Sequence, residues 1–136
     1  MERNQVVPFD LHWDDDNHTI LRIDIHGDST WAQQYEVVDE AVEALQGVAY
    51  RLDVIVHTIG QLPPGDPIPH LKDAISKLRA CPNLGLVVIV NRRTFYRSIV
   101  ELVLRLYSTQ NQHHGGFVDS LDEARQIIAK SRANAA

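Results

Sequence analysis

Leu84-Gly-Leu-Val-Val-Ile-Val-Asn91 is the stretch that decides the fold of this chain. A short, unbroken run of aliphatic residues has no polar face to turn toward water, which predicts a strand in a sheet that is covered on both sides. Leu52–Ile59 is a second run of the same kind. Apolar residues at helical spacing lie between the two runs and predict a crossover helix, so we expect the two strands to lie parallel.

Two more strands are expected before these runs, at Val6–Trp13 and His18–His26, joined by a hairpin turn at Asp14–Asn17. Apolar residues then recur every three or four positions from Trp31 to Leu45, which predicts an amphipathic helix. An Asp, Ser or Thr in residues 28–30 can cap its start, and Gly47 can cap its end. Trp31 and Tyr35 could stack on a ligand, although aromatic residues at this spacing are more often core.

The second half of the chain continues the alternation of loops, helices and strands. Gly60–Pro69 holds four prolines and two glycines, which predicts a loop. The crossover helix follows from Leu71 and should end near Cys81-Pro82-Asn83. A third helix is expected at about Thr94–Ser108. Phe117-Val118 should be a short edge strand, and Ser120–Glu123 has the spacing of a capping box that opens the last helix.

The sequence therefore predicts one α/β domain over residues 1–136. Its sheet should be mixed and mainly parallel, with an N-terminal β-hairpin and four helices in the order β-β-α-β-α-β-α-β-α. Right-handed crossovers are expected to place helices on both faces. Residues 1–5 and 133–136 should fray.

Composition narrows the class of protein. The 136 residues are 44% hydrophobic and 23% charged with a net charge of -5, which makes the surface a poor match for nucleic acid or anionic membrane. No apolar run approaches the ~20 residues of a membrane span, and no leader peptide is evident, so we expect a cytoplasmic protein. Cys81 is the single cysteine, which excludes an internal disulfide and favours a small buried filler.

The helix expected at 94–108 differs from the others because apolar residues surround most of its circumference. Such a helix is usually covered on more than one side. One small domain has few elements that could supply the second cover. We therefore expect a homodimer that buries part of this helix.

Several histidines and aspartates are candidate metal ligands. Asp14–Asp16 lie between His12 and His18, but they lack the alternating spacing of a calcium loop, so a solvated turn is expected. Adjacent side chains such as His113-His114 rarely converge on one ion. His57 lies in an apolar strand, where a hydrogen-bonded core or boundary histidine is more common than a base. No metal and no cofactor is predicted.

The ligand site should lie at the carboxyl ends of the parallel strands, where open α/β sheets tend to bind ligands. Loops 58–69 and 91–97 meet there. Three arginines around a helix N-terminus suit a phosphate or carboxylate, the alternative being a solvated helix end. The candidate ligand-binding residues are Thr58, Gly60, Arg92, Arg93, Thr94 and Arg97.

Catalytic motifs are lacking in the sequence. It contains no G-x-S-x-G elbow, no glycine-rich phosphate loop and no G-x-G-x-x-G. We therefore expect a protein without enzymatic activity.

Over nearly its whole length the chain resembles the STAS superfamily, in particular its small stand-alone bacterial members related to anti-sigma-factor antagonists and Sec14-like domains. The resemblance rests on the order of elements and on Phe117-Val-Asp-Ser-Leu-Asp-Glu-Ala124, which is similar to the family's F-x-S-x-x-E-A pattern. It implies a binding or regulatory module without catalytic residues.

The antagonists are phosphorylated in a D-S-[ST]-G turn, and the matching place here reads His57-Thr-Ile-Gly60. The resemblance thus implies Thr58 as a phosphorylation site, while the family's aspartate and adjacent serine are missing. The first hypothesis is a STAS-like module that binds a protein partner or itself. The alternative is a carrier for a small anionic or lipid ligand in the crevice at the ends of strands 52–59 and 84–91.

Overall fold

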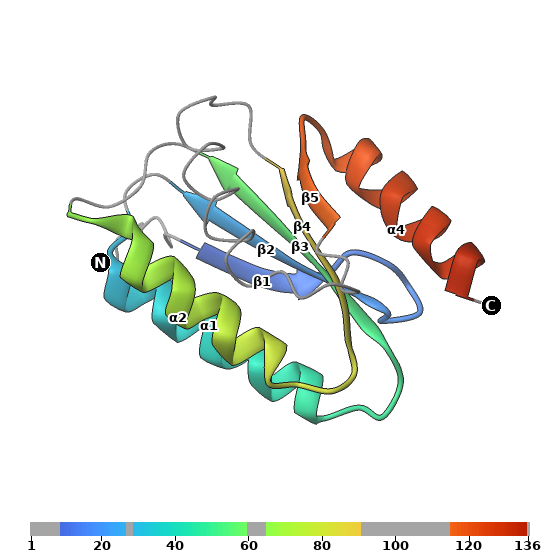
Figure 1. Ribbon diagram of the computed structural model, residues 1–136, viewed down its shortest axis with the longest axis horizontal. Coiled ribbons are helices and arrows are strands. Elements are labelled where there is room, and N and C mark those ends of the chain that lie inside the picture. Colours follow the sequence, from blue (N-terminus) through green and yellow to red (C-terminus); the bar gives the residue numbers. More distant parts are fainter. Residues whose placement is uncertain (1–8, 27–28, 60–64, 91–114, 136) are drawn as a thin grey trace, which may run out of the picture.

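The computed structural model describes residues 9–26, 29–59, 65–90 and 115–135, which form a five-stranded sheet and three helices (Figure 1). The strands are β1 (Phe9–Trp13), β2 (Ile20–His26), β3 (Leu52–Ile59), β4 (Leu84–Val90) and β5 (Gly115–Val118). The helices are α1 (Trp31–Gln46), α2 (Pro67–Arg79) and α4 (Leu121–Ala135). The predicted α/β class is confirmed. The helix expected at 94–108 lies outside the described residues.

The strands lie side by side in chain order. β1 and β2 pair antiparallel as the predicted N-terminal hairpin, and the three pairings from β2 to β5 are parallel, so the sheet is mixed. The expected parallel neighbourhood of β3 and β4 is confirmed. Within the described strands the order never reverses, so they contain no topological switch point of the kind that forms a crevice in doubly wound sheets.

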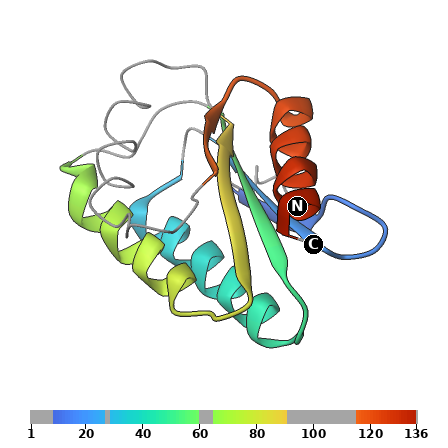
Figure 2. The same ribbon diagram turned by 45° about the vertical axis from the view of Figure 1, so that its right-hand side comes forward.

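The helices cover both faces of the sheet, as predicted. α1 and α2 each lead to the next strand in the same direction, so both lie on one face, side by side (Figures 1 and 2). α4 covers the other face over β3, β4 and β5.

Strand alternation divides the core into two layers. Leu21, Ile23, Val54 and Val87 point toward α1 and α2 and pack with residues such as Leu45. The second layer lies against α4, with Ile128 on that helix, and its members on the sheet are Ile20, Ile55, Leu86, Val88, Val90 and Val118. β3 and β4 are thus covered on both sides, as their apolar sequences predict.

Several element ends differ from the prediction. α2 begins at Pro67, inside the expected Gly60–Pro69 loop, because a proline is tolerated in the first turn of a helix, where the N–H groups have no intrahelical acceptor. β5 begins at Gly115, two residues early. α4 continues to Ala135.

Thr30 is the N-cap of α1, and it forms a capping box with Gln33. The Gln33 N–H donates to Thr30 Oγ1 at 3.1 Å, and the Thr30 N–H donates to Gln33 Oε1 at 2.8 Å. Gly47 is the C-cap, as predicted. The cap fixes where α1 starts, directly beyond the carboxyl end of β2.

Asp53 is a fully buried carboxylate at the start of β3. Arg51 and the Leu86 N–H donate to its Oδ1, at 2.9 and 2.7 Å, while Arg132 donates to Oδ2 at 2.8 Å. A buried charge is tolerated when it is paired and hydrogen-bonded in this way. Because Arg132 lies on α4, the network ties this helix to the sheet.

Within the described part of the chain, no helix has the combination of length and apolar composition that crossing a membrane requires.

Candidate functional site: an apolar cavity at the carboxyl edge of the sheet

A cavity of about 80 Å³ lies between α1, α2 and the sheet. Its floor consists of side chains from three adjacent parallel strands, among them Ile25 of β2, Val56 of β3 and Ile89 of β4. These residues lie near the carboxyl ends of their strands. The cavity therefore occupies the edge of the sheet at which the sequence predicts a ligand site.

The walls of the cavity come from α1 and α2. α1 contributes Trp31 and Tyr35, and α2 contributes His70 and Ala74, with further aliphatic residues deeper inside. Both helices follow parallel strands, so both begin at this edge. A single water needs roughly 10–15 Å³ of cavity volume, so the space holds several water-sized groups or the short apolar end of a molecule.

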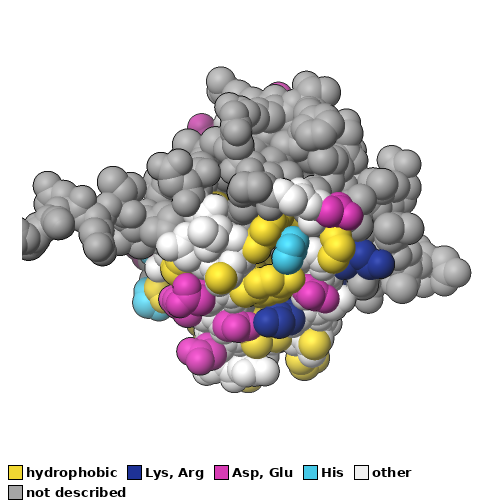
Figure 3. Space-filling view, turned by 90° about the vertical axis from the view of Figure 1, so that its left-hand side faces the viewer, with side chains coloured by type: hydrophobic (Ala, Val, Ile, Leu, Met, Phe, Trp, Pro, Cys, Tyr) yellow, Lys and Arg dark blue, Asp and Glu magenta, His cyan; other side chains and the backbone are white. Residues whose placement is uncertain are grey.

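Aromatic and polar side chains form the rim of this cavity. The Trp31 and His70 rings are stacked, with centroids 4.5 Å apart and planes inclined by 15°. Tyr35 Oη lies 3.0 Å from His70 Nδ1 and 3.1 Å from Asp73 Oδ2. Figure 3 looks onto this end of the molecule and shows hydrophobic side chains gathered around a histidine.

The rim hydrogen bonds define one consistent arrangement of protons. The Asp73 carboxylate can only accept, so the single Tyr35 proton is donated to it. His70 Nδ1 must then carry the proton that it donates to Tyr35 Oη. This leaves Nε2 of His70 as an acceptor, and with the described residues His70 makes hydrogen bonds only through Nδ1.

Partial burial, together with the hydrogen bond to Asp73 and the negative charge there, raises the pKa of Tyr35 above its ordinary value of 10.0. The phenol consequently keeps its proton at neutral pH. It is a hydrogen-bonding group of fixed orientation, and a poor base or nucleophile.

Lys77 and Asp39 continue the polar contacts between the two helices. Lys77 Nζ lies 2.9 Å from Asp39 Oδ1 and 5.2 Å from the centre of the Tyr35 ring. Both partners of this ion pair are well exposed, so it adds little to stability. With Asp73 included, the described groups beside the rim carry one negative charge in excess.

The predicted ligand residues are only partly described. Thr58 is half-buried on β3, two residues beyond Val56 and thus on the same face, and its hydroxyl donates to the Val90 carbonyl at 3.3 Å. The other five, Gly60, Arg92, Arg93, Thr94 and Arg97, lie outside the described residues.

The aspartate turn differs from the solvated turn that was expected. Asp14 has a side chain only 2% exposed, and it accepts from Arg22 at 2.9 Å and from Arg125 at 2.8 Å. The hydrogen bond from Arg125, assisted by its charge, lowers the pKa of Asp14 despite the opposing effect of burial. Only Asp16 of the three is exposed. The turn joins β1, β2 and α4.

Cys81 is buried, as predicted for a filler residue, and burial raises the pKa of its thiol.

Sequence reasoning missed His70 and Asp73. The signal was available in part, because two helices that both follow parallel strands begin at the same edge of the sheet. Their meeting with Tyr35 also requires the two helices to share one face, which local sequence patterns do not show.

Comparisons with protein-family models, with curated proteins and with solved structures each found no match.

Proposed function

We propose that this chain is a non-enzymatic, STAS-like binding module and that it takes the apolar end of a small molecule into the cavity between α1, α2 and the sheet. The observation that carries this proposal is the cavity itself, with its aliphatic interior and the polar groups that the described residues place at its rim. Ligand pockets typically combine a mainly apolar lining with a few fixed polar groups.

The rim supports binding rather than catalysis. Tyr35 and His70 are hydrogen-bonded to each other, and Tyr35 also donates to Asp73. The raised pKa of Tyr35 keeps it protonated. The acceptor nitrogen of His70 suits a hydroxyl group at the polar end of a ligand. The excess negative charge of the described rim favours a neutral polar end over an anionic one.

The STAS-like assignment is supported by the order of the described elements, with the N-terminal hairpin first and Ser120 capping α4. The Glu123 N–H donates to Ser120 Oγ at 3.2 Å. Fold alone does not define a function, so the ligand proposal depends on the cavity and not on this resemblance. Phosphorylation of Thr58, a cytosolic location and self-association through residues 94–108 stay predictions of the sequence.

Tryptophan fluorescence can test ligand binding directly. Trp13 and Trp31 are the two tryptophans, so a Trp13→Phe variant reports on the cavity alone. Each buried CH₂ gains about 0.8 kcal/mol, so a six-carbon chain should bind with a dissociation constant on the order of 0.1–1 mM. We expect hexanol to give a saturable change in Trp31 emission and hexanoate to give a weaker one.

Two matched alanine variants provide the control. Ala74→Leu fills the cavity and should abolish the response, whereas Ala80→Leu changes an exposed residue outside it and should retain the response. Circular dichroism verifies that both variants are folded. If neither probe gives a saturable change, or if folded Ala74→Leu responds like the parent, the proposed function is wrong.

A further inference from the structure

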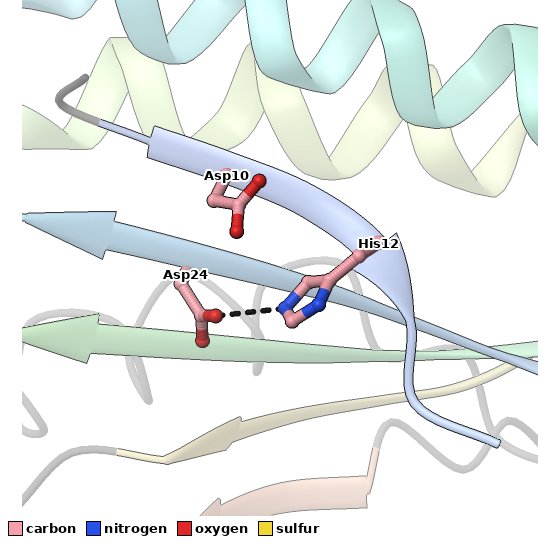
Figure 4. Close-up of side chains that lie close together, drawn as sticks. All are labelled: Asp10, His12 and Asp24. Atoms are coloured by element: carbon pink, nitrogen blue, oxygen red, sulfur yellow. Dashed lines mark hydrogen bonds and ion pairs between the residues drawn. The ribbon is translucent and has the colours of Figure 1, made fainter.

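A second cluster of polar side chains lies on the opposite face of the sheet. Phe9, Leu11 and Trp13 of β1 pack toward α1 and α2, so the alternate residues Asp10 and His12 point to the other face. Among the described elements α4 covers that face over β3 to β5. Figure 4 shows Asp10 and His12 on β1 beside Asp24 on β2.

The strand register brings like charges together in this cluster. Asp10 lies directly opposite Asp24 in the antiparallel pair of β1 and β2. Like charges at directly opposite positions destabilise a sheet. Asp10 also has no ion-pair partner among the residues that the structure describes. A cation between the two carboxylates would remove this repulsion.

His12 supplies a second, independent indication. Its Nε2 lies 2.8 Å from Asp24 Oδ2 and 3.1 Å from the N–H at Nε of Arg22. A ring nitrogen with a proton can donate to the carboxylate but repels the Arg22 N–H, and a ring nitrogen without a proton accepts from Arg22 but repels the carboxylate. The described groups therefore cannot satisfy both contacts at once.

Arg22 is the obvious competing cation for these carboxylates, but its guanidinium is directed elsewhere. Nη1 binds the almost fully buried Asp14 at 2.9 Å, whereas Nε lies 3.4 Å from Asp24 Oδ1. Arg22 therefore balances Asp14 and touches only one edge of the cluster. Its closest contact there is the His12 nitrogen.

We propose that Asp10, His12 and Asp24 form a binding site for one Zn²⁺ ion. One ligand atom from each residue lies within 4.8 Å of the others. Zn²⁺ holds nitrogen and oxygen ligands at about 2.0–2.2 Å, so tetrahedral ligands are about 3.3 Å apart, and small side-chain movements reach this geometry. An imidazole with two carboxylates suits Zn²⁺ better than Mg²⁺ or Ca²⁺, which prefer oxygen ligands alone.

The charge of the ion would balance the facing carboxylates. The unprotonated His12 Nε2 would direct its lone pair at the metal, and the Arg22 N–H would turn from this nitrogen to Asp24 Oδ1, which lies 3.4 Å from Arg22 Nε. Three protein ligands leave a fourth position for water.

His57 acts as a positioning residue for this site. It lies beside Asp24 in the parallel register of β2 and β3, and its Nδ1 donates to Asp24 Oδ1 at 3.1 Å. Hydrogen bonds of this kind orient a ligating carboxylate, and removing them typically weakens metal binding by roughly 10–100-fold. The site therefore spans three strands and is separate from the cavity, since Ile25 and Val56 beside these residues face the other way.

Metal titrations of the full chain test the site. We expect isothermal titration calorimetry to show one Zn²⁺ per chain, and Co²⁺ to give the intense visible absorption of tetrahedral coordination. His12→Gln and Asp10→Asn should each weaken Zn²⁺ binding by roughly tenfold or more. The matched controls are His18→Gln and Asp16→Asn, which change exposed residues of the neighbouring turn and should leave the affinity unchanged.

His57→Gln should weaken binding while leaving one site per chain, and Mg²⁺ should give no measurable heat. The exposed Asp10→Asn change is conservative, so this variant should fold even if His12→Gln does not. The proposal is overturned if the wild-type chain binds no Zn²⁺. It is equally overturned if folded Asp10→Asn binds as tightly as the wild type, which would place the ion elsewhere, for example at His113-His114.

Discussion

Gly85 lies directly against the carboxylate of the buried Asp53. A β-carbon on Gly85 would be 2.1 Å from Asp53 Oδ1 and 2.3 Å from Arg51 Nε. The same oxygen accepts the Leu86 N–H at 2.7 Å, so the carboxylate cannot withdraw without losing hydrogen bonds in a buried place. The absence of a side chain at this position is therefore a condition for the ionic network that holds α4 on the sheet.

Gly85→Ala should lower the free energy of unfolding by about 3 kcal/mol, because it combines overpacking with disruption of a buried ion pair. Urea denaturation measures the change. Gly47→Ala is the matched control: Gly47 has a φ of -79°, and a β-carbon there would meet Glu43 O at an ordinary 3.4 Å. That control should change stability by less than about 1 kcal/mol. Equal effects at the two positions would contradict this role of Gly85.

Asp15 should stabilise the hairpin turn through its hydrogen bonds. Its Oδ1 accepts the N–H groups of Thr19 and Ile20 at 2.8 and 2.9 Å, and its Oδ2 accepts the Thr19 hydroxyl. Asp15→Ala should lower the free energy of unfolding by about 1–3 kcal/mol at neutral pH, since these donors lose a charged acceptor. Asp16→Ala, at the exposed neighbour, should stay within about 0.5 kcal/mol of wild type.

The contribution of Asp15 to the free energy of unfolding should decrease as the pH falls. Burial raises the pKa of Asp15, but the hydrogen bonds from Thr19 and Ile20 and the nearby Arg132 outweigh it, so the pKa falls below its ordinary value of 3.8. A carboxyl group with a lowered pKa in the folded state stabilises the fold above its unfolded-state pKa and loses this contribution as the pH falls through the folded value. The difference between wild type and Asp15→Ala should hold at mildly acidic pH and shrink below 3.8. If the stability difference between wild type and Asp15→Ala grew on acidification, the pKa of Asp15 would not be lowered by folding.

Self-association is expected from the apolar circumference of residues 94–108. Sedimentation velocity at micromolar concentration should show a dimer, and dilution into the nanomolar range should release monomers. Hydrogen exchange in this segment should become faster as the dimer dissociates, because its second cover is lost. A compact monomer that retains protection of residues 94–108 after dilution would rule out the dimer as the cover for this helix.

Much of the fold could be predicted because the spacing of apolar residues along the sequence shows which faces of the helices and strands are buried. The aliphatic runs of β3 and β4 predict strands covered on both sides, and both are found in that position. The first residue of each helix or strand was harder to predict. Pro67, for example, is typical of a loop, although the first turn of a helix also tolerates a proline. The faces of α1 and α2 depend on the strand order, and local sequence patterns do not encode that order.

The candidate sites were less predictable because their residues come together only through the strand order and the strand register. Asp53 interrupts an apolar run, which signals a buried charge in need of a partner, yet Arg132 lies 79 residues away. Asp24 and His57 become neighbours only through the parallel register of β2 and β3. The carboxyl edge of the sheet was correctly singled out as the place to search, but the residues that form the cavity there come from helices whose placement was not predictable.

Intermolecular nuclear Overhauser effects between bound hexanol and protein methyl groups test ligand binding in the cavity most directly. At saturating hexanol we predict contacts to the methyl groups of Val56, Ala74 and Ile89, which line the cavity. The methyl groups of Ile55 and Val88 should show none, because they face α4 on the other side of the same strands. Contacts to Ile55 and Val88 in place of the cavity residues, or no intermolecular contacts at all, would contradict the proposed function.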